Sequence, residues 1–61
     1  MKTTEISLEI KHQTDDAFLL SDGDNDAWIP KSLLDHSPDP RTGEVIAFEM
    51  PEWVAIEKEF V

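Results

Sequence analysis

A short acidic stretch is the part of the sequence that comes closest to a metal-binding motif. Asp22, Asp24 and Asp26 stand at the first, third and fifth positions of a calcium-loop pattern. That pattern also requires glycine at the sixth position and glutamate at the twelfth, where this chain has Ala27 and Leu33. We therefore predict a solvent-exposed hairpin turn and no metal site, with weak divalent binding at high metal concentration as the open alternative.

Other residue types that carry catalysis are sparse. His12 and His36 are the only histidines, no cysteine accompanies them, and their spacing fits no zinc motif, so both are expected at the surface. Ser32 has no base near it in sequence, and Gly23 and Gly43 do not form a phosphate-binding loop. We therefore predict a protein that is not an enzyme, has no catalytic residues and uses no cofactor.

The net charge is the most informative property of the chain. Fourteen Asp and Glu residues face five Lys and Arg residues, which gives a formal charge of -9. Such a charge repels nucleic acid and anionic lipid and attracts basic protein surfaces. A charge of magnitude about 2–8 suffices to keep a small domain soluble. The slight excess favours a basic protein partner, with no direct nucleic acid and no membrane, over an acidity that serves solubility alone.

The length of 61 residues predicts a single domain, 1–61, with a thin hydrophobic core. A chain this short buries only about 60% of the surface that its unfolded form exposes. No disulfide stabilises it, so homo-oligomer formation stays open as a further source of stability. No apolar run reaches the length of a membrane span or a signal peptide, and a cytoplasmic location is expected.

Two kinds of apolar pattern predict the first two strands. Residues 3–11 alternate between polar and apolar types, which places Ile6, Leu8 and Ile10 on one face of a strand. Residues 17–20 are continuously apolar, which is typical of a central strand covered on both faces. A turn is expected between them.

Turn-forming residues divide the middle of the chain. Residues 21–25 predict a second hairpin, and its returning strand at 26–29 is expected to end at Pro30. Residues 31–34 are too few for a stable helix and predict either one helical turn or a short strand. Residues 35–43 contain two prolines and one glycine and predict a loop.

The C-terminal third combines a strand and a helix. Residues 44–50 alternate again and predict the fourth strand, after which Pro51 and Glu52 suit the first turn of a helix. This helix is expected to be about ten residues long and to pack on the sheet. Its predicted apolar stripe consists of Trp53, Val54, Ile56 and Phe60.

The order of the predicted elements defines the fold class. It is α+β and mostly β: a small curled antiparallel sheet, or an SH3-like or OB-like mini-barrel, of about four strands with one short C-terminal helix. Core packing is favoured for Trp28 and Trp53, because a small domain needs its largest apolar surfaces inside, and interface anchoring is the alternative. Phe60 and Val61 are the favoured candidates for an exposed apolar edge.

Two segments resemble a class of small acidic phage and prophage proteins. They are A-W-I-P-K-S at Ala27–Ser32 and M-P-E-W at Met50–Trp53, the second followed by a short helix. The resemblance implies a phage accessory protein in the cytoplasm of a host cell. Such proteins often disable host machinery that handles nucleic acid. Several inhibitors of this kind, anti-CRISPR proteins among them, are small, acidic and metal-free, and some imitate the charge of DNA.

Charge and resemblance together give the leading functional hypothesis. The protein is predicted to bind and block a basic, nucleic-acid-binding host protein, as a DNA mimic whose carboxylates occupy Lys and Arg sites that hold phosphates. Aromatic contacts are expected to fix the register. The predicted partner-binding residues are Asp22, Asp24 and Asp26 in one patch, Glu52, Glu57 and Glu59 in another, and Trp28 and Phe60 as aromatic contacts.

Two alternatives belong to other functional classes. The first is a small nucleic-acid-binding barrel that stacks bases on aromatic side chains, which the scarcity of basic residues opposes. The second is a structural or oligomeric accessory protein whose acidity serves only solubility.

Overall fold

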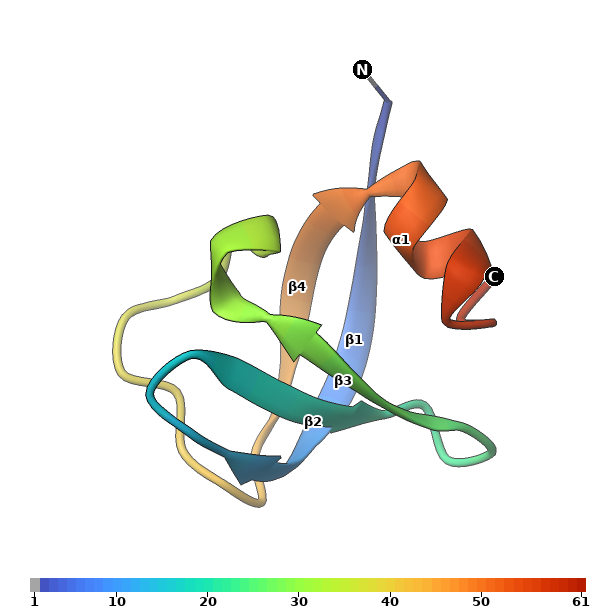
Figure 1. Ribbon diagram of the computed structural model, residues 1–61. Helices are drawn as coiled ribbons and strands as arrows, with labels where there is room; N and C mark the ends of the chain where they lie inside the picture. The colour runs from blue at the N-terminus through green and yellow to red at the C-terminus, as the bar shows by residue number, and fades with distance from the viewer. Residues whose placement is uncertain (1) are drawn as a thin grey trace.

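The structure is a computed structural model that describes residues 2–61. A four-stranded antiparallel sheet has the strand order β3-β2-β1-β4, and a short helix follows the last strand (Figure 1). The predicted fold class, α+β with mostly β structure and a curled antiparallel sheet, is confirmed. The elements are β1 (Thr3–Gln13), β2 (Ala17–Ser21), β3 (Asp26–Pro30), the single 3-10 turn η1 (Lys31–Leu33), β4 (Val45–Pro51) and α1 (Glu52–Glu57).

The inner face of the sheet is apolar because apolar and polar residues alternate along the strands. Strand pairing aligns the apolar residues: Ile10 lies opposite Leu20, and Phe18 lies opposite Ile29. A β-bulge between Ile10 and His12 lets β1 bend, so that it pairs with β4 in its first part and with β2 in its last. The largest fully buried side chains are Leu8, Ile10, Phe18, Leu20, Ile29, Phe48, Met50 and Val54.

The segment after η1 closes part of the gap between the two edges of the sheet. Asp35 forms a bridge with Glu49 of β4: each residue's N–H donates to the other's carbonyl, at 2.8 and 2.9 Å. The next residue, His36, packs its ring against Phe18 of β2 and Phe48 of β4, with centroid distances of 5.2 and 5.8 Å. The surface prediction is therefore wrong for His36, which is half-buried because it fills the space between two core rings.

Helix α1 buries only part of the apolar stripe that the sequence predicted. Val54 and Ala55 are buried, whereas Trp53 and Ile56 are 51% and 57% exposed. The predicted apolar stripe is confirmed at Val54 and Phe60 and wrong at Trp53 and Ile56, because the helix turns Val54 and Ala55 toward the core. The helix is also shorter than predicted, at six residues.

The end of α1 explains why the helix is short. The N–H of Phe60 donates to the carbonyl of Ala55 at 2.9 Å, and the N–H of Glu59 donates to that of Ile56 at 3.1 Å, which is a Schellman motif. Glu59 adopts a left-handed conformation with φ of 63°. The chain reverses there and returns Phe60 to the core with 8% exposure, so the prediction of an exposed Phe60 is wrong. Val61 remains 69% exposed.

Candidate protein-binding surface

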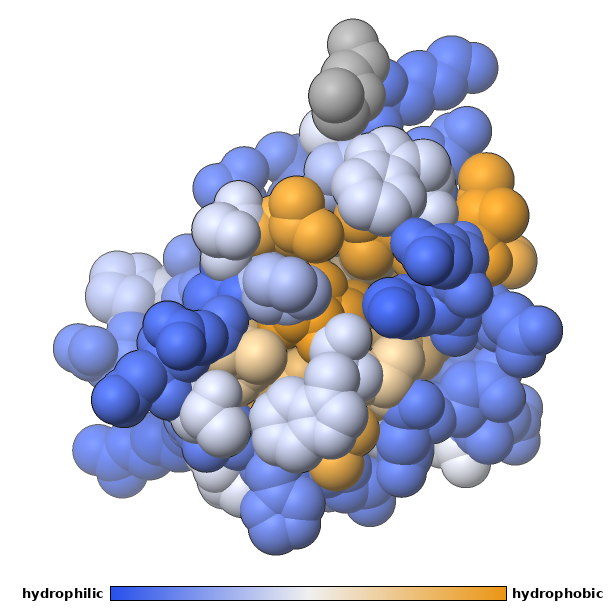
Figure 2. Space-filling view, viewed as in Figure 1, coloured by the Kyte–Doolittle hydropathy of each residue, from blue (hydrophilic) through white to orange (hydrophobic). Residues whose placement is uncertain are grey.

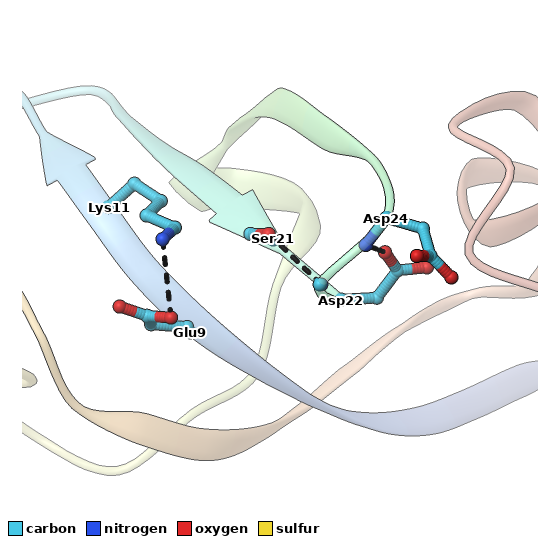
Figure 3. A network of polar contacts seen from close by, with 6 residues as sticks. Glu9, Lys11, Ser21, Asp22 and Asp24 are labelled. Atoms are coloured by element: carbon cyan, nitrogen blue, oxygen red, sulfur yellow. Dashed lines mark hydrogen bonds and ion pairs between the residues drawn. The ribbon is translucent and has the colours of Figure 1, made fainter.

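Almost all of the Asp and Glu side chains are exposed to solvent. Every Asp and Glu is exposed except Glu9, which is half-buried. Among residues 2–61 a single ion pair forms, between Lys11 Nζ and Glu9 Oε1 at 3.4 Å (Figure 3). The negative charge is thus left uncompensated over most of the surface, which is the condition for attracting a cationic partner.

The tip of the β2–β3 hairpin is organised by an aspartate. Asp22 Oδ1 accepts a hydrogen bond from the N–H of Asp24 at 2.8 Å, and Ser21 Oγ accepts one from the N–H of Gly23 at 3.1 Å (Figure 3). Asp22 Oδ1 also accepts a hydrogen bond from the N–H of Asn25 at 2.7 Å. The amides of Asn25 and Asp24 lower the pKa of the Asp22 carboxyl below its ordinary value, because they stabilise its ionised form. Asp22 therefore holds the turn together, as Asx turns do.

The structure brings parts of the two predicted acidic patches together. The Asn25 side-chain amide donates from Nδ2 to the Glu59 carbonyl at 3.1 Å, which places the hairpin tip beside the end of α1. Figure 1 shows this proximity at the C-terminus. Glu52 lies at the opposite end of the helix and stays apart from this region. We call the combined surface the acidic corner, and it consists of Asp22, Asp24, Asp26, Glu57 and Glu59.

The local structure of α1 disfavours the acidic residues at its end. The last turn contains Glu57, although a helix C-terminus carries partial negative charge and favours cations such as the C-cap residue Lys58. Glu59 occupies a left-handed position that suits glycine. Each choice lowers stability, and residues that break local rules in this way are expected at functional sites.

Both tryptophans are exposed, so the prediction that they pack in the core is wrong. Trp28 is 48% exposed and Trp53 is 51% exposed. Trp28 lies on the outer face of the sheet because Ala27 and Ile29, its neighbours along β3, point to the core. Asp26, a residue of the acidic corner, is two residues away on the same strand, and Trp28 therefore shares a face of β3 with it. Phe60 is buried and contributes no contact surface.

Apolar and hydrophilic surface are arranged together on the face that carries α1 and β3. Figure 2 shows apolar atoms in the middle of this face, between α1 and the segment formed by β3 and η1, with hydrophilic residues around them. An apolar centre with a charged rim is the usual anatomy of a protein–protein interface.

Within residues 2–61, no group of three or more His, Asp or Glu side chains is placed to hold a metal ion. The same residues include no helix with the length and apolar character needed to cross a membrane. No protein-family model, curated protein or solved structure matches the chain. The functional proposal is therefore built on this chain's own residues.

Proposed function

We propose that the protein is a non-enzymatic accessory protein that binds a basic, nucleic-acid-binding partner and blocks its nucleic-acid site. The observation that carries the proposal is the acidic corner, where two acidic segments far apart in sequence meet and no described cation forms an ion pair with their carboxylates. Carboxylates in such an array attract the Lys and Arg side chains that otherwise bind phosphates.

Trp28 supplies an apolar contact surface, which the carboxylates alone do not provide. Long-range attraction between charges speeds association, but a half-exposed tryptophan is the side-chain type most enriched among residues that dominate binding energy. Its position beside Asp26 lets one partner surface contact both. The phage-type context is carried by the sequence resemblance and belongs to the same proposal.

Capture of a partner at low salt tests the proposal. The immobilised chain is exposed to bacterial lysate, and bound protein is eluted with increasing salt and then challenged with double-stranded DNA. We expect a basic protein that elutes steeply with salt and that DNA displaces, because both ligands compete for the same cations. Capture that is equally strong at high salt, or that DNA does not affect, would contradict the proposal.

A matched pair of variants locates the binding surface. The first replaces Asp24, Asp26, Glu57 and Glu59 by their amides, leaving Asp22 to hold the turn. The control replaces Asp15, Asp16, Asp39 and Glu44 by their amides; these residues are also exposed and lie elsewhere in the chain. Both variants have the same net charge, so loss of capture only in the first assigns binding to the acidic corner.

The exposed tryptophans also support a second candidate, a small protein that binds single-stranded nucleic acid by stacking. Bases stack on exposed aromatic rings, and Trp28 and Trp53 are both about half exposed. A charge of -9 opposes this reading, since binding to a nucleic-acid backbone relies on cations. A gel shift with single-stranded DNA is the test, and we expect no shift.

A further inference from the structure

A hollow of about 180 Å³ opens between η1 and the end of β4. Leu33, Leu34, Met50 and Pro51 form its apolar lining, and two of them, Leu34 and Met50, belong to the hydrophobic core. Pockets for drug-sized ligands start at about 300 Å³. The hollow is therefore suited to a single inserted side chain rather than to a cofactor.

Two carboxylate residues also line this hollow. Asp35 and Glu49 face each other in the bridge that joins the segment after η1 to β4, with both of their backbone hydrogen bonds formed. In such a pair the Cα atoms lie about 5.5 Å apart and the side chains stand on the same side. The hollow, whose lining is part apolar and part polar, is thus bordered by two neighbouring negative charges.

No cation of the described chain neutralises these charges. Glu49 also lies directly opposite Glu5 in the β1–β4 pairing, which adds a third carboxylate to the row. Like charges in directly opposite positions destabilise a sheet. The ion pair formed within residues 2–61 involves Lys11 and Glu9 instead. The row across Asp35, Glu49 and Glu5 therefore complements a positive charge from outside the chain.

We propose that the hollow receives an arginine side chain of the protein partner. The aliphatic part of that side chain packs on the half-buried Leu33 and Pro51, and its guanidinium group lies between the carboxylates of Asp35 and Glu49. A guanidinium is planar, offers donors on two edges and is weakly hydrated, so it suits two carboxylates beside an apolar wall better than an ammonium group does. The inference rests on the proposed function for the sign of the partner's charge, but it concerns a surface separate from the acidic corner.

An NMR titration of the full chain with Nα-acetyl-arginine amide tests the inference directly. At constant ionic strength we expect saturable shifts of backbone amide resonances at Leu33, Leu34, Asp35 and Glu49. The corresponding citrulline amide, which has the same shape and no charge, is expected to cause no saturable shift. Shifts spread over all the acidic residues without saturation would overturn the inference. Equally strong binding of Nα-acetyl-lysine amide, which carries an ammonium group in place of the guanidinium, would also overturn it.

Two single variants control for the loss of charge. Glu49→Gln keeps the backbone bridge and is expected to weaken arginine binding about three- to tenfold, as the loss of one exposed charge-assisted contact does. Glu44→Gln removes an exposed carboxylate that lies outside both the hollow and the acidic corner, and it is expected to leave the affinity unchanged. Equal affinity in Glu49→Gln and the unmodified chain would overturn the inference.

The titration and the capture experiment test the two proposals separately. Partner capture that depends on the acidic corner, together with no arginine binding at the hollow, would reject this inference and leave the proposed function standing. Arginine binding at the hollow without capture of any DNA-displaceable protein would reject the proposed function as it stands.

Discussion

Two hollows of similar size differ in how their polar groups are satisfied. The hollow beside η1 has a volume of about 180 Å³, and a second one, of about 200 Å³, lies between β1 and the turn after β2. In the second hollow Glu9 pairs with Lys11, and Asp22 accepts two backbone N–H groups. In the first hollow the chain provides no ion-pair partner for Asp35 or Glu49 among its described residues.

The difference separates carboxylates that maintain the fold from carboxylates that the described chain leaves without an ion-pair partner. Asp22 stabilises a turn, and removing its side chain should weaken the fold. Glu49 faces Asp35 and Glu5, and removing its charge should strengthen the fold. The opposite signs of these effects provide a way to identify functional carboxylates in an acidic protein.

The largest expected effect concerns the apolar lining of the two hollows. Met50 is 1% exposed, so Met50→Ala should lower the free energy of unfolding by about 2–5 kcal/mol because it leaves a cavity in the core. Val45 lines the second hollow but is 66% exposed, and Val45→Ala should change stability by no more than about 0.5 kcal/mol. Urea denaturation measures the free energy of unfolding of both variants. Similar losses of stability would contradict the distinction between Met50, which belongs to the core, and Val45, which lies at the surface.

The turn after β2 provides the next test. Asp22→Ala should lower the thermal midpoint at neutral pH because two backbone N–H groups lose their acceptor, whereas Asp22→Asn keeps an acceptor oxygen and should lower it less. The folded-state pKa of Asp22 is depressed, so its contribution is present above the ordinary Asp pKa and is lost as the pH falls through the lower folded pKa. A pH series should therefore show the unmodified chain and Asp22→Ala converging in acid, and a constant difference would contradict this role.

A pair of substitutions at Glu59 separates backbone strain from charge. Glu59→Gly relieves a left-handed conformation and should stabilise the protein by up to about 1 kcal/mol. Glu59→Gln removes the same charge and leaves the backbone unchanged. The difference between the two free energies of unfolding isolates the strain at this position, and equal values would show that there is none.

The smallest expected effect is the relief of charge repulsion at the hollow beside η1. Glu49→Gln should raise the free energy of unfolding by about 0.2–1 kcal/mol at low salt, and the gain should fade as salt screens the charges. Glu9→Gln in the other hollow loses a pair with Lys11 and should bring no gain. A stabilisation of the same size in both variants would remove the contrast between the hollows.

The strands and turns were predictable because they depend on local pattern. The alternation along β1 and β4, the turn residues between β2 and β3, and Pro51 before α1 all act within a few residues. The outward orientation of Trp28 was also predictable, because its neighbours along β3 on both sides are apolar and successive residues of a strand point to opposite faces. The prediction of core packing for Trp28 rested on the size of its side chain and not on the alternation along the strand, and it was therefore wrong.

Contacts between distant segments were not predictable in the same way. The bridge between Asp35 and Glu49 depends on where the chain crosses after η1, and the bond between Asn25 and Glu59 depends on how α1 ends. The return of Phe60 to the core needs a glutamate in a left-handed conformation, for which glycine is the usual sequence signal. These contacts determine which carboxylates lie together, and so the predicted acidic residues were grouped only in part.

The salt dependence of stability measures most directly whether the carboxylates are left uncompensated by the fold. Urea is the appropriate denaturant because it is uncharged, and the free energy of unfolding of the unmodified chain is compared at low and at moderate sodium chloride concentration. The account predicts higher stability in the added salt, because screening weakens repulsion among the exposed Asp and Glu residues. Lower stability in salt would show that attraction between opposite charges dominates the folded surface, and it would contradict the account.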